Sequence, residues 1–237
     1  MSDRRRKRVA VVTGANRGIG LEVCRQLAAA GQHVVLGSRN AAAGEAAARS
    51  LAARGLDVES HQLDVTDEAS VRALADYVEH TLAGADVLVN NAGLLLDEDG
   101  DVLEVAVQHF RDCMETNAYG PLRLTQALMP GMISRGYGRV VNVSSEAGQI
   151  SSMSDYAPPY SVSKAALNAL TRLLAASARG RDVLVNAVDP GWVRTDMGGR
   201  AAPRSLAQGA DTIFWCAMLP RGGPSGRFFH DRQETDW

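Results

Sequence analysis

The chain has 237 residues, of which 46% are hydrophobic and 22% charged, a composition typical of a globular protein and too apolar for a disordered chain. A formal net charge of −2 gives no basic footprint for nucleic acid, and no apolar stretch approaches the roughly 18 residues of a membrane span. The three cysteines are far apart and odd in number, which excludes a disulfide framework and indicates a reducing, cytoplasmic compartment.

The chain begins with a basic run, residues 1–8, which we expect to form a solvated tail ahead of the first strand. The apolar stretch behind it ends at Thr13-Gly14 and is too short for the core of an export signal. Of the 25 basic residues, 23 are Arg, and Lys164 is the only lysine beyond this tail. Because almost every other basic residue is Arg, Lys164 is a candidate for chemistry that Arg cannot perform.

Short apolar runs alternate with longer helical patterns along the rest of the chain. The predicted strands are residues 9–13, 33–38, 57–63, 86–90, 138–144, 182–188 and 226–230. The predicted helices are residues 19–30, 41–54, 68–82, 103–133, 161–178 and 205–219. Most runs lack polar alternation, as expected for strands that are covered on both faces. The pattern predicts one α/β domain over residues 9–237, a Rossmann-type doubly wound parallel sheet of about seven strands with helices on both faces.

A glycine-rich loop, Thr13-Gly14-Ala15-Asn16-Arg17-Gly18-Ile19-Gly20, joins the first predicted strand to the first predicted helix. Its spacing is Gly-x-x-x-Gly-x-Gly and not the Gly-x-Gly-x-x-Gly dinucleotide fingerprint. At this place a pyrophosphate can meet the N–H groups and the positive end of a helix. The position therefore favours a dinucleotide site over a purely structural turn, which remains the alternative.

Five motifs in this order resemble those of the short-chain dehydrogenase/reductase family. After the glycine loop come Asn90-Asn91-Ala92-Gly93, Val141-Asn142-Val143-Ser144-Ser145, Tyr160-Ser161-Val162-Ser163-Lys164 and Asp189-Pro190-Gly191-Trp192-Val193-Arg194-Thr195-Asp196-Met197. The resemblance covers nearly all of residues 9–237, and the five motifs together are far more specific than any one of them.

The end of the second predicted strand indicates which dinucleotide is bound. An NAD enzyme usually places Asp or Glu there, about 20 residues beyond the glycine loop, to hold the ribose 2′-hydroxyl. The sequence Leu36-Gly37-Ser38-Arg39-Asn40 has no carboxylate, and Arg39 offers a planar fork to a 2′-phosphate. Arg17 is a second cation, at a position where NADP-using family members often carry one. We predict NADP(H), the alternative being that both arginines are solvated surface residues.

The resemblance implies the remaining cofactor contacts. Asp64, followed by Val65, would hold the adenine amino group, Asn91 would lie against the adenosine ribose, and the Val193 backbone and Thr195 hydroxyl would hold the nicotinamide carboxamide. The full set of expected cofactor-binding residues is Gly14, Asn16, Arg17, Gly18, Ile19, Gly20, Arg39, Asp64, Val65, Asn91, Ala92, Gly93, Tyr160, Lys164, Pro190, Gly191, Val193 and Thr195.

Tyr160 and Lys164 are four residues apart on a predicted helix and therefore share a face. Pro158-Pro159 cannot lie inside a helix, which places the pair in its first turns. To act as a base near neutrality, the tyrosine pKa must fall from about 10 to near 7, which takes roughly 4 kcal/mol of interaction with positive charge. Lys164 and an oxidised nicotinamide ring could supply that charge.

By resemblance to the family, Tyr160 is the general acid or base, Ser145 binds the substrate oxygen, Lys164 lowers the pKa of Tyr160 and binds the nicotinamide ribose, and Asn117 anchors a proton-relay water. Ser144 and Tyr156 are the rival serine and tyrosine. No Gly-x-Ser-x-Gly elbow occurs, and the five histidines show no metal-ligand spacing, so we expect neither a serine hydrolase nor a metal site.

The chain's last twelve residues, 226–237, and the motif from Asp189 look like the carbonyl reductase and menthone-type reductase branch of the family. The expected function is NADPH-dependent reduction of a ketone or aldehyde. The alternatives are a 3-oxoacyl-carrier-protein-type ketoreductase, an alcohol dehydrogenase of a biosynthetic pathway, or a non-catalytic NADP-binding regulatory protein. The helices at 103–133 and 161–178 resemble those through which family members assemble, so we expect a homodimer or homotetramer, with no nucleic-acid or membrane partner.

Overall fold

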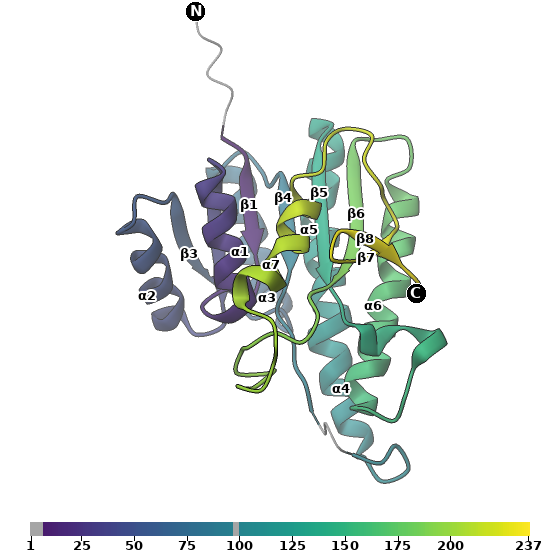
Figure 1. The fold of residues 1–237 in the computed structure, drawn as a ribbon. Helices are drawn as coiled ribbons and strands as arrows, with labels where there is room; N and C mark the ends of the chain where they lie inside the picture. The colour runs from purple at the N-terminus through teal and green to yellow at the C-terminus, as the bar shows by residue number, and fades with distance from the viewer. Residues whose placement is uncertain (1–6, 97–99) are drawn as a thin grey trace, which may run out of the picture.

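Among residues 7–96 and 100–237, which the computed structural model describes, eight strands form one sheet in the order β3-β2-β1-β4-β5-β6-β7-β8 (Figure 1). The parallel strands are β1 (Val9–Val12), β2 (His33–Ser38), β3 (Val58–Gln62), β4 (Val87–Asn90), β5 (Gly138–Val143), β6 (Val183–Asp189) and β7 (Phe228–His230). Strand order reverses between β1 and β4, and ligands of such sheets bind at the carboxyl ends of the strands near this switch point.

Helices cover both faces of the sheet. They are α1 (Gly18–Ala29), α2 (Ala41–Ala52), α3 (Glu68–Thr81), α4 (Val107–Met114), α5 (Gly120–Arg135), α6 (Pro158–Ser177) and α7 (Leu206–Ala217). Ala10 and Val12 of β1 pack in a core with α1 and α7, whereas Val9 and Val11 pack in a second core with α3 and α5. Because successive side chains of a strand point to opposite faces, an uninterrupted apolar run fills both cores. The predicted doubly wound α/β fold is confirmed.

The structure adds one strand to the seven that the sequence predicts. β8 (Gln233–Thr235) pairs antiparallel with β7 at the edge of the sheet, and its residues are largely exposed. It has no apolar run because one face and one edge meet solvent, so the periodicity of a buried strand is absent.

The helix predicted over residues 103–133 starts later in the structure and contains a π turn. α4 begins only at Val107, a π-helical turn, η1 (Glu115–Tyr119), follows it, and α5 continues to Arg135. Leu103, at which the predicted helix began, lies before α4 and is 90% exposed, so its apolar side chain is not part of a buried helix face. The predicted start of this helix was wrong by four residues, whereas its helical conformation runs on through the π turn, a single inserted turn that is often found inside α-helices.

The last predicted helix before β6 begins earlier than expected. α6 starts at Pro158, so Pro158 and Pro159 occupy its first positions, where a backbone N–H has no partner within the helix. Ala157 just before them has φ 43°, a left-handed conformation that turns the chain into the helix. Tyr160 and Lys164 accordingly lie in the first two turns of α6.

The end of the predicted basic tail contacts the domain. Residues 1–6 lie outside the described residues, but Lys7 pairs with Asp57 at 3.0 Å and the Arg8 guanidinium lies 4.0 Å from the centre of the Tyr137 ring. In the described ranges no helix is both long and apolar enough to cross a membrane. The same residues contain no group of three or more His, Cys, Asp or Glu side chains that could hold a metal ion.

Candidate active site

The glycine loop lies at the carboxyl end of β1, against the segment that follows β4. Gly14 and Gly18 have φ values of 61° and 59°, which favour glycine. A Cβ atom on Gly14 would lie 2.8 Å from the Cα of Ala92, and one on Gly20 would lie 2.5 Å from the Nδ2 of Asn91. The loop therefore closes onto the switch point between β1 and β4 only because these positions lack side chains.

Asn91 fixes this close approach through hydrogen bonds. Its Nδ2 donates to the carbonyl oxygens of Thr13 at 2.9 Å and Gly14 at 3.2 Å. The Thr13 hydroxyl in turn accepts hydrogen bonds from the backbone N–H groups of Asn91 and Ala92 at 3.0 and 2.9 Å. The Asn91 side chain thus supports the glycine loop, while Ala92 and Gly93 continue along its edge.

The residues that follow β2 and β3, on the other side of the glycine loop from β4, include two charged side chains of the expected cofactor site, Arg39 and Asp64. Arg39 is exposed, and its guanidinium makes no hydrogen bond or salt bridge within residues 7–96 and 100–237. Burial raises the pKa of Asp64, but hydrogen bonds from Thr66 at 2.7 and 2.9 Å and the charge of Arg39 outweigh it, so the pKa lies below its usual range. Asp64 is therefore an anionic acceptor beside a free guanidinium.

Two expected cofactor residues are engaged with the protein itself. The Arg17 guanidinium of the glycine loop forms an ion pair with Asp196, and both side chains are more than two-thirds exposed, at 71% and 72%. Val65 is buried, and a Cβ on Gly120 of α5 would lie 2.9 Å from its side chain. Arg17 thus links the glycine loop to the segment after β6, and Val65 contributes packing behind the edge.

Tyr160 and Lys164 lie side by side in the first turns of α6, with exposed fractions of 9% and 4%. The Lys164 Nζ lies 5.4 Å from the centre of the Tyr160 ring and donates to the carbonyl oxygen of Val143, at the end of β5, at 2.7 Å. Burial lowers the pKa of Lys164 to about 8. Burial also raises the pKa of Tyr160 well above its usual range, and the hydrogen bond with Ser145 opposes this only in part.

The two neighbouring serines after β5 have different environments. The Ser144 hydroxyl is buried and donates to the Oδ1 of Asn168 at 2.6 Å, which commits it to the packing of α6. Ser145 is partly exposed, and its hydroxyl bonds Tyr160 and accepts from the backbone N–H of Ala147 at 3.2 Å. Of the two, Ser145 is the one whose hydroxyl lies against Tyr160.

Asn117 lies in the π turn η1, fully buried beneath the segment after β4. Its Oδ1 accepts from the backbone N–H of Leu94 at 2.7 Å, and its Nδ2 donates to the Leu94 carbonyl at 2.8 Å and the Ser163 hydroxyl at 2.9 Å. A Cβ on Gly93 would lie 3.6 Å from the Asn117 Oδ1 and 3.9 Å from the Lys164 Nζ. The π turn, a feature often found at functional sites, thus places Asn117 between the β4 edge and α6.

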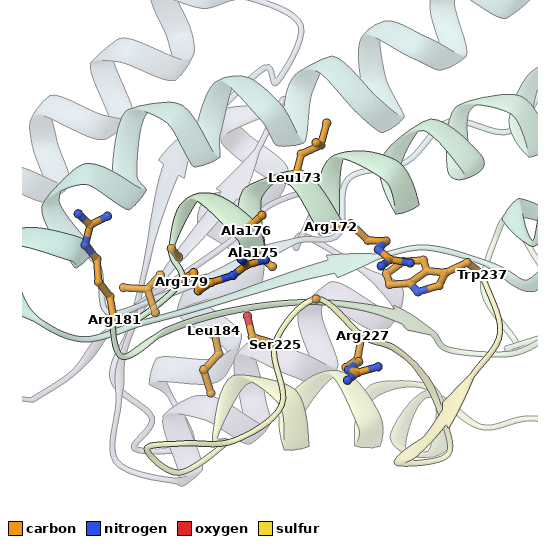
Figure 2. Close-up of a pocket in the computed structure, with 14 residues that line it drawn as sticks. Arg172, Leu173, Ala175, Ala176, Arg179, Arg181, Leu184, Ser225, Arg227 and Trp237 are labelled. Atoms are coloured by element: carbon orange, nitrogen blue, oxygen red, sulfur yellow. The ribbon is translucent and has the colours of Figure 1, made fainter.

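A cavity of about 550 Å³ opens beside Tyr160. Its lining combines Ser145 and Tyr160 with most of the segment expected to hold nicotinamide, namely Ile19, Pro190, Gly191, Val193 and Thr195. The rival Tyr156 also lines it, but is 40% exposed. A slightly larger groove, about 580 Å³, lies at the other end of α6 between Arg181, Arg172 and Trp237 (Figure 2) and contains none of these residues.

Comparison with known proteins identifies the family. The family model described as short chain dehydrogenase matches residues 8–205. The chain is 35% identical to carbonyl reductase (NADPH) 1 of Sus scrofa over 97% of its length and 94% of the relative's. It is also 33% identical to (+)-neomenthol dehydrogenase of Arabidopsis thaliana, over 97% and 98% of the two lengths.

This chain belongs to the short-chain dehydrogenase family. Among solved structures, that of NADPH-bound carbonyl reductase from chicken fatty liver matches with a TM-score of 0.86 and 29% identity, covering 98% of this chain and 100% of that one. The alignment with the Sus scrofa protein spans 281 positions, more than the 237 residues of this short-chain dehydrogenase, so that relative carries segments that are missing here.

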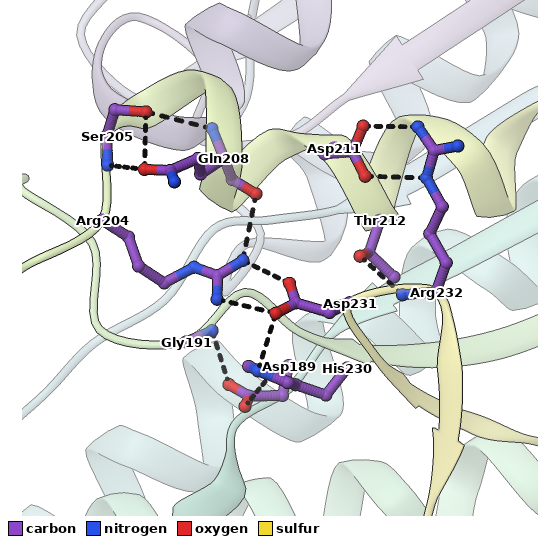
Figure 3. A network of polar contacts seen from close by, with 10 residues as sticks. All are labelled: Asp189, Gly191, Arg204, Ser205, Gln208, Asp211, Thr212, His230, Asp231 and Arg232. Carbon is purple, nitrogen blue, oxygen red and sulfur yellow. Dashed lines mark hydrogen bonds and ion pairs between the residues drawn. The ribbon is translucent and has the colours of Figure 1, made fainter.

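In this short-chain dehydrogenase the segment after β6 is held by side-chain contacts that the sequence patterns did not predict (Figure 3). Asp189 accepts from the Gly191 N–H at 2.9 Å and from His230 Nδ1 at 2.8 Å. Arg204 closes the loop by ion-pairing with Asp231 and by accepting the Arg194 N–H on its carbonyl at 3.0 Å. The Asp189–His230 and Arg204–Asp231 pairs join residues that are 41 and 27 positions apart, and no spacing in the sequence signals them.

Proposed function

We propose that this chain is an NADPH-dependent oxidoreductase that reduces a ketone or aldehyde to the alcohol. The observation that carries the proposal is the cavity beside α6, where Tyr160 and Ser145 face the same space as Gly191, Val193 and Thr195. A carbonyl group in that space can meet two hydroxyl donors from one side. The matched family and its reductase relatives support this reaction class.

The residues present fit NADP(H). The glycine cradle at the β1–β4 switch point leaves backbone N–H groups of Gly18 and Ile19, at the start of α1, open to a pyrophosphate. At the adenosine end, Arg39 supplies a guanidinium that has no partner among the described residues, where a 2′-phosphate would need a charged donor. Asp64 stands beside it as the acceptor for the adenine amino group.

When bound, NADPH supplies the hydride, and the chain supplies position and a proton. The Ser145 hydroxyl donates a hydrogen bond to the substrate carbonyl oxygen, which holds and polarises it. Tyr160 donates its phenolic proton to the same oxygen as negative charge develops there. The raised pKa of Tyr160 keeps this hydroxyl protonated at neutral pH, the form that reduction requires.

Lys164 and Asn117 act behind this pair. Lys164 presents its ammonium to the ribose hydroxyls of the nicotinamide half while its bond to the Val143 carbonyl fixes its direction. The lowering of the Tyr160 pKa by Lys164, expected from the sequence, stays a prediction for the loaded enzyme. Asn117 fixes Leu94 and Ser163, and so shapes the passage through which a relay water would resupply the proton.

A panel of carbonyl compounds tests the reaction. NADPH consumption, followed by its near-ultraviolet absorbance, should occur with small ketones or aldehydes and be slower with a 3-oxoacyl thioester. Alcohols with NADP⁺ test the reverse direction. Tight NADPH binding without turnover of any carbonyl or alcohol would favour the non-catalytic alternative.

We further propose a homodimer or homotetramer, acting in the cytoplasm, with residues 1–8 as tail and 9–237 as the folded domain. The assembly is supported by exposed apolar side chains on α4 and α6, where Val107, Val162 and Leu173 are 64%, 43% and 65% exposed. The compartment rests on the three cysteines, which are buried and form no disulfide in the part of the chain that the structure describes. Light scattering at micromolar concentration tests the assembly, and a 25.2 kDa particle would overturn it.

A further inference from the structure

The cavity beside Tyr160 has two parts, if the proposed function holds. Ile19, Pro190, Gly191, Val193 and Thr195 are assigned above to the cofactor, so the rest of the lining is left for the substrate. That remaining wall includes Leu95, Glu146, Ser152, Tyr156, Trp192 and Met197. Its chemistry should therefore report what kind of carbonyl compound the enzyme accepts.

The lining as a whole is acidic. Among the described residues that line this cavity, the charged side chains are Glu146 and Asp189, with no Lys or Arg. Asp189 is buried and already engaged with His230 at 2.8 Å and with the Gly191 N–H at 2.9 Å (Figure 3). The exposed carboxylate of Glu146 makes no hydrogen bond or ion pair within residues 7–96 and 100–237, so no protein group there neutralises its charge.

Glu146 also lies close to the reacting group. It follows Ser145 directly and opens the short 3-10 turn Glu146–Gly148, which Ser145 caps by accepting the Ala147 N–H at 3.2 Å. Consecutive Cα atoms are about 3.8 Å apart. Because Ser145 and Glu146 line the same cavity, a substrate whose oxygen is held by Ser145 extends toward Glu146 with the atoms a few bonds from its carbonyl.

Aromatic rings share this part of the wall. Tyr156 and Trp192 are 40% and 58% exposed, and the Trp192 Nε1 donates to the Gly198 carbonyl at 2.7 Å, which fixes its ring on the loop. Aromatic faces attract organic cations, and an unpaired carboxylate does so more strongly. The combination recognises a cation and repels an anion.

We propose that the preferred substrates are carbonyl compounds that carry a positively charged amine a few bonds from the carbonyl carbon, with Glu146 as the residue that selects them. This inference rests on the proposed reductase function. It also separates the enzyme from ketoreductases of acyl carriers, whose phosphorylated substrates are anionic and would be repelled by Glu146.

Three matched acetophenones test the inference. They carry a meta trimethylammoniomethyl group, the uncharged neopentyl group of the same shape, or an anionic carboxymethyl group. The ratio of kcat/KM for the cationic over the neutral ketone should be about tenfold for the wild type, from one charge pair near a protein surface. It should fall with added salt, and the anionic ketone should be the poorest.

Variants assign the effect to one carboxylate. Glu146→Gln should bring the cationic-to-neutral ratio close to one and weaken binding of the cationic alcohol product to the NADP⁺ complex. Asp76→Asn, which removes an exposed carboxylate on α3 outside the cavity, should leave the ratio unchanged. The salt dependence of the wild type tests, without any variant, that the preference is electrostatic.

The outcomes separate this inference from the reductase assignment. If the wild type reduces the neutral ketone but shows no preference for the cation, or if Glu146→Gln retains the preference, the inference is wrong and the reductase stands. If NADPH binds but none of the ketones is reduced, both are overturned.

Discussion

The proposed cofactor site runs along the carboxyl ends of the strands, from the end of β2 to the start of α6, and its two ends are built differently. At the α6 end, Lys164 and Asn117 are buried and each is held by hydrogen bonds to backbone of the β4 and β5 region. At the β2 end, Arg39 is exposed and its guanidinium has no hydrogen bond or salt bridge within the described part of the chain. Packing and hydrogen bonds thus fix the side chains at the α6 end, whereas the Arg39 side chain at the β2 end is left for a ligand to contact.

This difference separates two kinds of consequence. A side chain that is buried and hydrogen-bonded is preorganised, so a substitution there changes the rate and can change the fold. A free surface side chain contributes only when its ligand arrives, so a substitution there changes affinity and leaves the fold alone. The predictions below test this separation.

The largest effect is expected at the α6 end for Tyr160→Phe. The phenylalanine keeps the packing of the ring but removes the proton donor, so kcat should fall about a thousandfold, within the range typical of a lost general acid. NADPH affinity should stay nearly unchanged, because the assigned role of the Tyr160 hydroxyl is proton transfer to the substrate. Steady-state kinetics and a fluorescence titration measure the two quantities, and a large loss of affinity would contradict the assigned role.

Lys164→Arg should have the next largest effect. The guanidinium keeps the charge but not the compact ammonium that fits between the Val143 carbonyl and the ribose hydroxyls, so kcat should fall about a hundredfold and cofactor binding should weaken. Lys7→Arg is the matched control, since Lys7 is the other lysine of the chain and pairs with Asp57 away from the cavity. Wild-type kcat and cofactor affinity in Lys164→Arg would show that this helix is not catalytic.

The fold was predictable where a local pattern reports burial directly. Strands such as Val87–Asn90 are buried on both faces and therefore read as apolar runs. The edge strand Gln233–Thr235 is exposed and carries no such run, and the single π turn Glu115–Tyr119 lies within a longer helix that the pattern did locate. Sequence periodicity reports which face of a helix or strand is buried. It therefore does not reveal an exposed edge strand or a single π turn.

The site was predictable where one residue type is required at one place. Lys164 stood out as a lone lysine, and the glycines of the first loop stood out by their spacing. The pairing of Arg204 with Asp231 was not predictable, because it depends on the path of two distant segments. Neither was the free carboxylate of Glu146, because a sequence does not show which charges remain unpaired.

At the β2 end, the change with the next largest expected effect is Arg39→Ala. It should weaken NADPH binding about tenfold, the loss of a charge-assisted contact to the 2′-phosphate, while NADH affinity and thermal stability stay the same. The wild type should bind NADPH at least about tenfold more tightly than NADH for the same reason. Adding Ser38→Asp to Arg39→Ala should reverse the order, and equal affinities in the wild type would remove the basis of the coenzyme assignment.

The smallest effect, in the opposite direction, is expected on stability from Lys164→Met. Burial lowers the pKa of Lys164 from 10.5 to about 8, so a charged lysine is unfavourable in the folded protein at neutral pH. The lost hydrogen bond to Val143 offsets most of the relief, and we expect a net gain of about 1 kcal/mol in the free energy of unfolding.

The pH dependence identifies the cause of that gain. Between pH of about 8 and 10.5 the unfolded chain binds one more proton at Lys164 than the folded chain, so this group makes the wild type more stable as pH rises through that window. Methionine has no such dependence, so the advantage of Lys164→Met should be largest below pH 8 and shrink above it. Urea unfolding of both proteins from neutral pH to about pH 9, below the ordinary pKa of tyrosine, measures the difference. An advantage that stays constant with pH would assign the gain to packing, and a less stable variant would show that the hydrogen bond to Val143 outweighs the burial of the charge.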